Sequence, residues 1–257
     1  MSHFRVMQFN MQFGQSWDEA APDAAPINLG GTIAEVRKHN PDILLLQEVE
    51  HAASDGTQPP MPPNYTRLRE ELGGEYDSHV AMPKPDSREL PFGVGLAIFS
   101  RTALSDLKRT DLPSPLIHFD FFGQDKTPTD RLLIGTSTVI GGRKLQIFNT
   151  HLLAFFMLKS SSREHPQQRA IIVDMLKRSE GPTIIGGDFN ISHHESLVNQ
   201  MAGAGYSTVQ QSQITWRRMP FVLDHLFYNS QLRCVGHAVA PTMASDHHVL
   251  VADFELE

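Results

Sequence analysis

Carboxylate, amide and imidazole side chains recur in six short motifs along the 257-residue chain. Such groups can hold a hard cation such as Mg²⁺, which prefers oxygen ligands and keeps several waters, so that one or two carboxylates suffice. They can also activate water and neutralise phosphoryl oxygens, as the hydrolysis of a phosphate ester requires. In chain order the motifs are FN (9–10), QEV (47–49), NTHL (149–152), GDFN (187–190), LDHLFY (223–228) and SDHH (245–248).

The motifs coincide with strand-like runs. Several runs are apolar and end in a polar group, namely Asn10, Glu48, His151, and Asp188 with Asn190. Polar residues placed repeatedly at strand ends predict one rim of a sheet assembly, where a site can be built on rigid supports. The strand-like runs cover 4–10, 42–49, 92–100, 131–140, 144–151, 183–190, 221–229 and 245–256.

The stretch IIGGDFN (184–190) combines a short buried strand with two glycines, an acid and an amide. Gly186 and Gly187 allow a sharp turn or a close backbone approach that a side chain would block. Asp188 and Asn190 are two positions apart, so in an extended segment they point the same way. Taken alone, these residues also fit a structural turn.

Two helices and two long loops are predicted between the strands. Helix-like apolar spacing covers 31–40 and 165–181. The Pro, Gly, Asp and Ser content of 14–30 and 51–64 marks irregular segments. Neither segment separates two parts that could fold alone, so we expect them to be insertions within one domain.

The bulk properties exclude several classes of protein. The net charge of −7 argues against a surface that coats polyanions. Cys234 is the only cysteine, so an internal disulfide is impossible and a buried structural thiol is expected. No apolar run reaches the length of a membrane span, and MSHFRVMQFN (1–10) is unlike a secretion signal. We expect a cytoplasmic protein, although a secretion signal removed beforehand would leave no trace.

The six motifs, in this order, resemble those of the endonuclease/exonuclease/phosphatase superfamily. It includes pancreatic-type deoxyribonucleases, abasic-site endonucleases, inositol-polyphosphate 5-phosphatases and bacterial sphingomyelinases. The motifs run from residue 9 to residue 248, nearly the whole chain. The resemblance implies an α/β (α+β) fold, a four-layer α/β/β/α sandwich of two mixed, mainly antiparallel sheets. With the loop pattern, we expect a single domain over 1–257.

The resemblance also implies a metal side of the site, for Mg²⁺ or Mn²⁺. Glu48 is the first candidate ligand because it follows the buried-looking run LLLQ, and its alternative is a solvated carboxylate at a strand end. Asn10 would help to arrange the metal or the phosphate. Asp246 would face the metal side.

Further residues are implied around the reacting phosphate. Asp188 would orient or deprotonate the attacking water, and Asn190 would hydrogen-bond a phosphoryl oxygen. His151 would donate to a phosphate oxygen, the alternative being a core histidine satisfied by backbone. His247 would contact the phosphate and share protons with the reacting oxygens, while Asp224 would fix its tautomer and charge.

Two nearby segments leave their alternatives open. Arg217 and Arg218 in TWRR could add a phosphate contact or belong to a solvated surface. The run LLAFFML (152–158) could line an apolar leaving-group pocket, although core packing is favoured. Four more histidines are expected to be structural rather than catalytic or zinc-binding: His193, His194, His225 and His248.

Residues and resemblance together predict divalent-metal-dependent hydrolysis of phosphoesters by in-line attack of water. We expect a monomer that acts on phosphodiesters, nucleic acid among them, although the acidic balance weakens a nucleic-acid substrate. The alternatives are a lipid or small-molecule phosphoesterase similar to sphingomyelinases or inositol phosphatases, and a non-catalytic binding module. Such a module would be expected to lack at least one of five residues that this chain retains: Glu48, Asp188, Asn190, Asp246 and His247.

Two other metal-dependent classes do not fit. A calcineurin-like phosphoesterase needs an early Asp-x-His and a Gly-Asn-His motif in places where this chain has neither. A zincin needs His-Glu-x-x-His, which is absent from the sequence.

Overall fold

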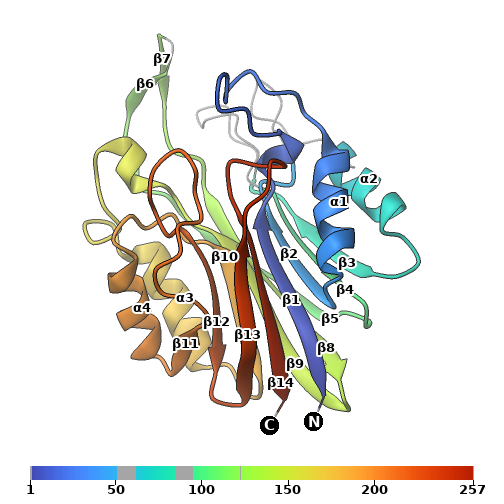
Figure 1. Ribbon diagram of the computed structural model, residues 1–257. Coiled ribbons are helices and arrows are strands. Elements are labelled where there is room, and N and C mark those ends of the chain that lie inside the picture. Colours follow the sequence, from blue (N-terminus) through green and yellow to red (C-terminus); the bar gives the residue numbers. More distant parts are fainter. Residues whose placement is uncertain (1, 51–61, 85–94, 122, 257) are drawn as a thin grey trace.

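Two six-stranded sheets lie face to face, and helices cover the outer face of each (Figure 1). This computed structural model describes residues 2–50, 62–84, 95–121 and 123–256. The layer order of helices, sheet, sheet, helices confirms the four-layer α/β sandwich expected from the sequence. No helix within the described ranges is long and apolar enough to cross a membrane.

The first sheet is mixed, with one parallel pair at its centre. β1 and β2 run parallel, while the other neighbours in this sheet are antiparallel. Its strands, in spatial order, are β13 (Leu232–Ala240), β14 (Val249–Leu256), β1 (His3–Asn10), β2 (Ile43–Gln47), β4 (Leu96–Ser100) and β3 (Asp77–Ala81).

The second sheet repeats this plan, with β9 and β10 as its parallel pair. A small hairpin of β6 (Phe119–Phe121) and β7 (Gln124–Lys126) projects from the body at the upper left of Figure 1. The strands of the second sheet, in spatial order, are β11 (Tyr206–Thr208), β12 (Asp224–Asn229), β10 (Thr183–Asp188), β9 (Arg143–His151), β8 (Arg131–Ile140) and β5 (Ser105–Leu112).

The helices pack on the outer face of each sheet through a stripe of apolar residues. In α1 (Leu29–His39), the buried residues Leu29, Ile33 and Val36 recur at helical spacing and pack on the first sheet with α2 (Pro63–Glu71). The helices α3 (Gln167–Lys177) and α4 (His194–Ala202) cover the second sheet in the same way. Two short 3₁₀ turns, η1 (Gln12–Gly14) and η2 (Phe155–Leu158), follow β1 and β9.

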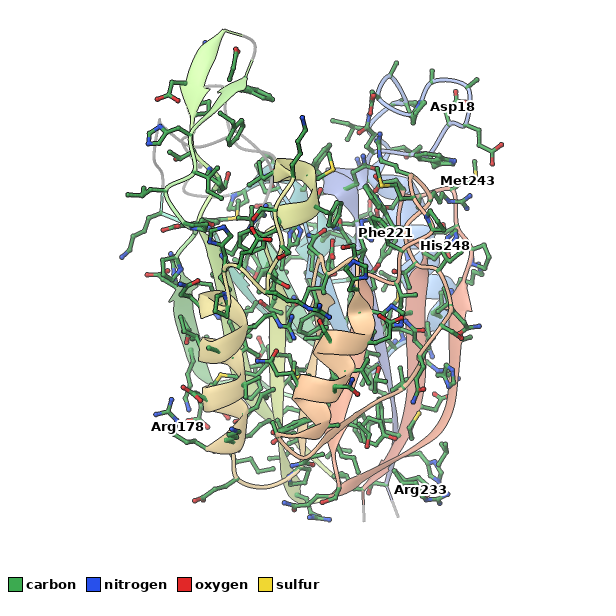
Figure 2. All side chains as sticks on the ribbon, turned by 90° about the vertical axis from the view of Figure 1, so that its left-hand side faces the viewer. Asp18, Arg178, Phe221, Arg233, Met243 and His248 are labelled. Carbon is green, nitrogen blue, oxygen red and sulfur yellow. The ribbon has the colours of Figure 1, made fainter. Side chains whose placement is uncertain are left out.

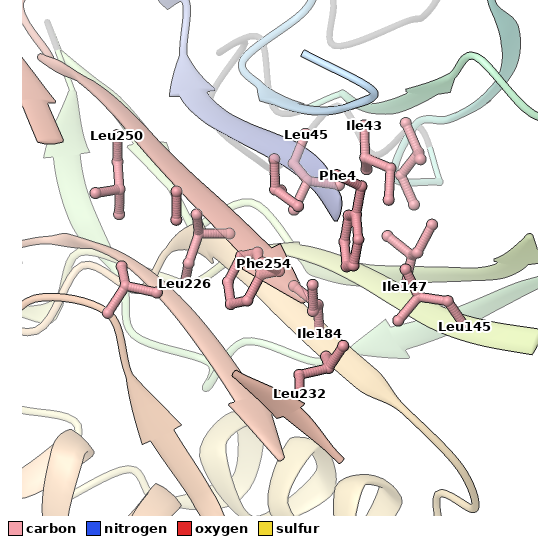
Figure 3. Close-up of a cluster of buried hydrophobic side chains, with 14 of the residues drawn as sticks. Phe4, Ile43, Leu45, Leu145, Ile147, Ile184, Leu226, Leu232, Leu250 and Phe254 are labelled. Carbon is pink, nitrogen blue, oxygen red and sulfur yellow. The ribbon is translucent and has the colours of Figure 1, made fainter. Parts of the chain in front are cut away.

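The main core lies between the two sheets. Phe4 and Leu45 of the first sheet meet Ile147, Ile184 and Leu226 of the second (Figure 3). These side chains are at most 4% exposed, so their burial removes nearly all of their apolar surface from water. Because both sheets contribute to one core, their relative position is fixed along its whole length.

Several element boundaries differ from the sequence-based expectation. The strand predicted over 42–49 ends at Gln47, because Glu48 has a left-handed backbone with φ 49°. The helix predicted over 31–40 begins two residues earlier, at Leu29, inside the expected loop 14–30. Residues 51–61 of the other loop and 92–94 of the third predicted strand lie outside the described residues.

Other elements were not expected from the sequence at all. The edge strand β5, SDLKRTDL, is mostly exposed and has no apolar run to signal it. The helices α2 and α4 are only nine residues each, and their apolar stripe is correspondingly short. Short or exposed elements carry too few buried residues for a periodic pattern to stand out.

The two glycines of IIGGDFN lie inside β10, so of the two alternatives they serve a close backbone approach and not a sharp turn. A Cβ on Gly186 would lie 2.5 Å from a methyl of Leu45 on the facing sheet. A Cβ on Gly187 would lie 2.1 Å from the carbonyl oxygen of Thr150 on β9, and its φ of +157° also disfavours a side chain. The two glycines are required because β10 packs closely against Leu45 of the facing sheet and against the backbone of the adjacent strand β9.

We expect Gly187→Ala to destabilise the fold by about 3 kcal/mol or more, because the obstacle is backbone. Gly186→Ala should lower the free energy of unfolding by about 1–3 kcal/mol. The obstacle here is a side chain, Leu45, whose methyl groups have little room to move in a packed core. Gly203→Ala is the control, because its Cβ would meet no atom closer than 3.5 Å. Urea unfolding measures all three, and a Gly187→Ala protein as stable as the Gly203→Ala control would contradict this packing.

Candidate active site

Strand register brings three of the sequence-predicted residues into one row across the second sheet. Asp188 ends β10 directly opposite His151 of β9 on one side and Asp224 of β12 on the other. On the facing sheet, Asn10 ends β1 and Glu48 follows the end of β2. The row and the facing strand ends meet at one end of the sandwich, the upper end in Figure 1.

Asn10 connects the two sheets at this rim. Its side-chain nitrogen donates to Glu48 Oε1 at 3.1 Å and to Asp188 Oδ2 at 3.0 Å. Its side-chain oxygen accepts from the backbone N–H of Gln12. Asn10 therefore presents a donor, not an oxygen ligand, to the two carboxylates.

Two residues of the rim have uncommon backbone conformations. Glu48 and Asn190 both have φ 49°, in the left-handed region that residues with a side chain seldom adopt. The Asn190 backbone N–H donates to Asp188 Oδ1 at 2.9 Å, and its amide donates to the carbonyl of Leu152 at 3.0 Å. Such local strain persists where surrounding contacts hold it, and it clusters at functional sites.

His247 lies against Asp224 at the centre of the site. His247 Nδ1 is 2.8 Å from Asp224 Oδ2, and the ring packs beside Trp216 with centroids 6.2 Å apart. The other ring nitrogen, Nε2, lies 3.7 Å from Asp188 Oδ2. On the far side of Asp188, His151 Nε2 lies 3.5 Å from the same oxygen.

A buried chain of amides, which was not predicted from the sequence, supports the pair of His247 and Asp224. Gln8 donates to Asp224 Oδ1 at 2.9 Å and to Gln47 Oε1 at 2.7 Å. Gln47 in turn donates to Asn149 Oδ1 at 2.7 Å. Each of these amides precedes a site residue by one or two positions in the motifs QFN, QEV and NTH, which is the signal that could have identified them.

Burial shifts the ionisation of the site groups in opposite directions. It raises the pKa of Glu48 to about 6, with nearby Asp246 adding to the rise, and that of Asp188 to about 7. Burial alone would lower the pKa of His247, but the Asp224 carboxylate raises it to about 10. Burial lowers the pKa of His151 well below 6.5. The site thus combines a protonated His247 with a neutral His151.

Asp246 is held at the edge of the site by two donors. Its Oδ2 accepts from Arg218 Nε at 2.6 Å and from the indole N–H of Trp216 at 3.2 Å. Arg218 also pairs with Asp23 at 2.7 Å. Arg217 donates to the carbonyl of Thr242. Both predicted phosphate-binding arginines are therefore engaged within the protein.

The segment 152–158 divides between core and site. Leu152, Leu153 and Phe155 are buried, whereas Phe156 is half-buried against Trp216 and Phe221, at ring distances of 5.8 and 5.3 Å. Figure 2 shows Phe221 and His248 in the upper half of the molecule. An aromatic surface thus borders His247.

The remaining histidines lie apart from the reacting groups. His225 is fully buried and stacks on Phe227, and burial lowers its pKa to about 4. His194 is the first residue of α4 and contacts the carbonyl of Gln211, and His193 caps that helix.

Among the described residues, the group of acids and histidines close enough to share a metal is Asp188, Asp224 and His247. Both oxygens of Asp224, however, already accept hydrogen bonds from Gln8 and His247.

Sequence comparison identifies relatives for parts of the chain. A UPF0294 protein of Vibrio cholerae serotype O1 is 35% identical over 125 residues, and one of Vibrio campbellii is 29% identical over 121 residues. Each of these matches covers 45% of this chain and 41% of the relative, so the chain spans less than half the length of the curated relatives it matches.

Solved structures share the fold across the whole chain. An endonuclease/exonuclease/phosphatase from Beutenbergia cavernae matches with a TM-score of 0.72 at 19% identity, over 100% of this chain and 72% of that one. The human nocturnin catalytic domain, with bound sulfate, matches with a TM-score of 0.68 at 22% identity, over 99% and 95%. D. rerio TDP2 in complex with a single-strand DNA product matches with a TM-score of 0.67 at 17% identity, over 99% and 100%.

A family model provides the most direct assignment. The model described as the endonuclease/exonuclease/phosphatase family matches residues 7–247, which include the strand ends Asn10 and Asp188 and the closing His247. The match confirms the resemblance found in the six motifs. The chain belongs to the endonuclease/exonuclease/phosphatase family.

Proposed function

We propose that this protein is a divalent-metal-dependent phosphoesterase that hydrolyses phosphodiesters by in-line attack of water. The observation that carries the proposal is the row of His151, Asp188 and Asp224, with His247 seated on Asp224 and Glu48 facing the row. A base, two imidazoles of different charge and carboxylates converge on one rim, which is the set that phosphoester hydrolysis needs.

Asp188 is the residue that we assign to orient and deprotonate the attacking water. Its pKa, raised to about 7 by burial, is suited to accepting a proton near neutral pH. Asn10 and the Asn190 backbone hold its two oxygens in place. Its position therefore does not depend on the substrate.

His247 and His151 are assigned complementary roles at the phosphate. His247, kept positive by Asp224, would donate to a phosphoryl or leaving oxygen. His151 stays neutral and offers one N–H without adding charge. Asn190, fixed through the carbonyl of Leu152, would add a second neutral donor.

Glu48 and Asp246 form the donor set that fits a hard divalent cation. Both offer oxygen, and the charge of Asp246 contributes to the raised pKa of Glu48, so these two residues would hold a cation whose charge relieves the repulsion. When bound, Mg²⁺ or Mn²⁺ would neutralise charge on phosphoryl oxygens. Asn10, expected beside the metal, would instead position Glu48 through its amide N–H.

We propose that the substrate is a phosphodiester of the kind that nucleases cleave. TDP2, which shares the fold, was solved with a single-strand DNA product. The second candidate is a lipid or small-molecule phosphoesterase, favoured by the aromatic surface of Phe156, Trp216 and Phe221 beside His247, which suits an apolar leaving group. We propose that the whole chain works as one domain and as a monomer.

A substrate panel tests the function. With Mg²⁺ or Mn²⁺, we expect turnover of plasmid DNA, single-strand DNA or bis(p-nitrophenyl) phosphate, complete loss with EDTA, and recovery on adding metal back. Sphingomyelin, RNA and an aryl phosphomonoester complete the panel. Preference for sphingomyelin would select the second candidate, and turnover that persists in EDTA would refute the metal requirement.

Glu48→Gln should weaken Mn²⁺ binding, because it removes the anionic oxygen that a hard cation prefers. Calorimetric titration of Mn²⁺ measures this without relying on activity. Glu180→Gln, an exposed residue beyond the end of α3, is the control and should bind like the parent. Unchanged Mn²⁺ affinity in Glu48→Gln would remove Glu48 from the metal site.

His247→Ala should lower kcat/KM by roughly 10²–10⁴, the usual cost of losing a positioned proton-transfer group. Asp224→Asn should also reduce kcat/KM, but the double variant should lose little beyond His247→Ala, because residues that act as one unit are not additive. The control is His248→Ala, the half-buried neighbour, which should stay near the parent rate. Fully multiplicative losses in the double variant would show that the two residues act independently.

A further inference from the structure

A small cavity opens directly behind Asn190, between the segment that follows η2 and the start of α4. Two of its wall residues, Asn190 and Phe156, also border the candidate active site. The remaining wall is rich in hydroxyl groups and carries one arginine, and it comprises Phe155, residues 160–163, residues 191–193 and Ser196. The cavity therefore continues from the catalytic rim, and none of the roles assigned so far uses its polar wall.

A buried guanidinium stands behind this wall, and within the described part of the chain none of its hydrogen-bond partners is a carboxylate. Arg169 is 8% exposed, and its donors reach Gln200 Oε1 at 2.6 Å, Ser162 Oγ at 3.1 Å, Ser196 Oγ at 3.2 Å and the Ser196 carbonyl at 2.8 Å. All of these acceptors are uncharged. A buried cation of this kind is usually paired with an anion.

Arg163 adds a second positive charge in the cavity wall. Its charge, after burial itself, lowers the pKa of Arg169, so the two guanidiniums lie close enough to repel each other. Two acids lie near Arg163: Glu164 is the next residue in the chain, and the charge of Arg163 acts on Glu195. Glu164 accepts from Ser160 and Ser161 at the exposed rim, and Glu195 is fully exposed. Neither accepts a hydrogen bond from Arg169, so the cavity has one guanidinium in its wall and a second one behind it.

The hydroxyl of Ser162 can donate a hydrogen bond to a ligand. Ser162 Oγ accepts from Arg169, which leaves its own proton for another acceptor. Ser196 Oγ instead donates to the carbonyl of His193. Ser162 and Arg163 thus place a hydroxyl and a guanidinium in the wall of one cavity, and both groups suit a phosphate.

We propose that this cavity binds a second phosphate of the substrate, one nucleotide away from the phosphate that is cleaved. Phe156 lies between the cavity and the aromatic surface beside His247, so the nucleoside between the two phosphates packs on it. The proposal rests on the proposed phosphodiesterase function and narrows its substrate to a nucleotide chain. Such a site would allow an acidic protein to favour a polyanion locally.

Binding of thymidine 3′,5′-bisphosphate is compared with that of thymidine 5′-monophosphate, by calorimetry in EDTA so that no turnover occurs. We expect the bisphosphate to bind about tenfold more tightly, as one additional charge-assisted contact allows. Arg163→Gln and Ser162→Ala should each reduce that advantage, while Glu164→Gln should increase it by removing a like charge at the rim. Arg178→Gln, at the opposite end of the molecule in Figure 2, and Ser207→Ala are the controls and should bind like the parent.

Turnover separates this proposal from the proposed function. With bis(p-nitrophenyl) phosphate, which has one phosphate, Arg163→Gln should keep the parent KM; with a 3′-phosphorylated thymidine 5′-(p-nitrophenyl phosphate), its KM should rise about tenfold. If the bisphosphate advantage is present but no phosphodiester is cleaved, the proposed function is wrong and the second phosphate site stands. Equal affinity for the two nucleotides in the parent protein, or an advantage that Arg163→Gln and Ser162→Ala leave intact, would overturn the second phosphate site.

Discussion

The organisation of this protein depends on a line of buried amides that joins its two sheets. Gln8 and Gln47 of the first sheet reach Asn149 and Asp224 of the second through hydrogen bonds of 2.7–2.9 Å, and all four residues are fully buried. A buried polar group left without a partner costs about 1–3 kcal/mol. A shift of one sheet along the other would break several of these bonds together, so the amides select one register from those that the apolar core alone would allow.

That register determines the geometry at the rim. Asp224 ends the line of amides, and His247 is seated on its free oxygen. Asn10 makes the second connection between the sheets, from Glu48 to Asp188. The left-handed backbone at Glu48 is tolerated because the sheet on one side and Asn10 on the other hold it. The chemistry of the site is thus built from contacts that also align the fold.

Charge is distributed unevenly, so that an acidic chain can present positive groups to the anionic substrate that we propose. The net charge is −7, yet the rim holds a protonated His247, and the adjoining cavity holds Arg163 with Arg169 behind it. Asp188 is buried and the Glu48 side chain is 24% exposed; desolvation raises the pKa of both carboxyl groups, and a bound cation would stabilise their charged forms. Local arrangement therefore outweighs the overall balance.

The sequence predicted the polar residues at the strand ends, because strand-length apolar runs are local signals, while the layered fold was implied by the resemblance of the six motifs to a known family. Asn10, Glu48 and Asp188 end or directly follow such runs, so the sequence predicts that they lie at one rim of the sheets. The hydrogen-bond partners of the site residues, in contrast, depend on the tertiary structure. That Gln8 supports Asp224, 216 positions away, and that Arg218 is engaged by Asp246 depend on pairings between distant segments, which no local periodicity encodes.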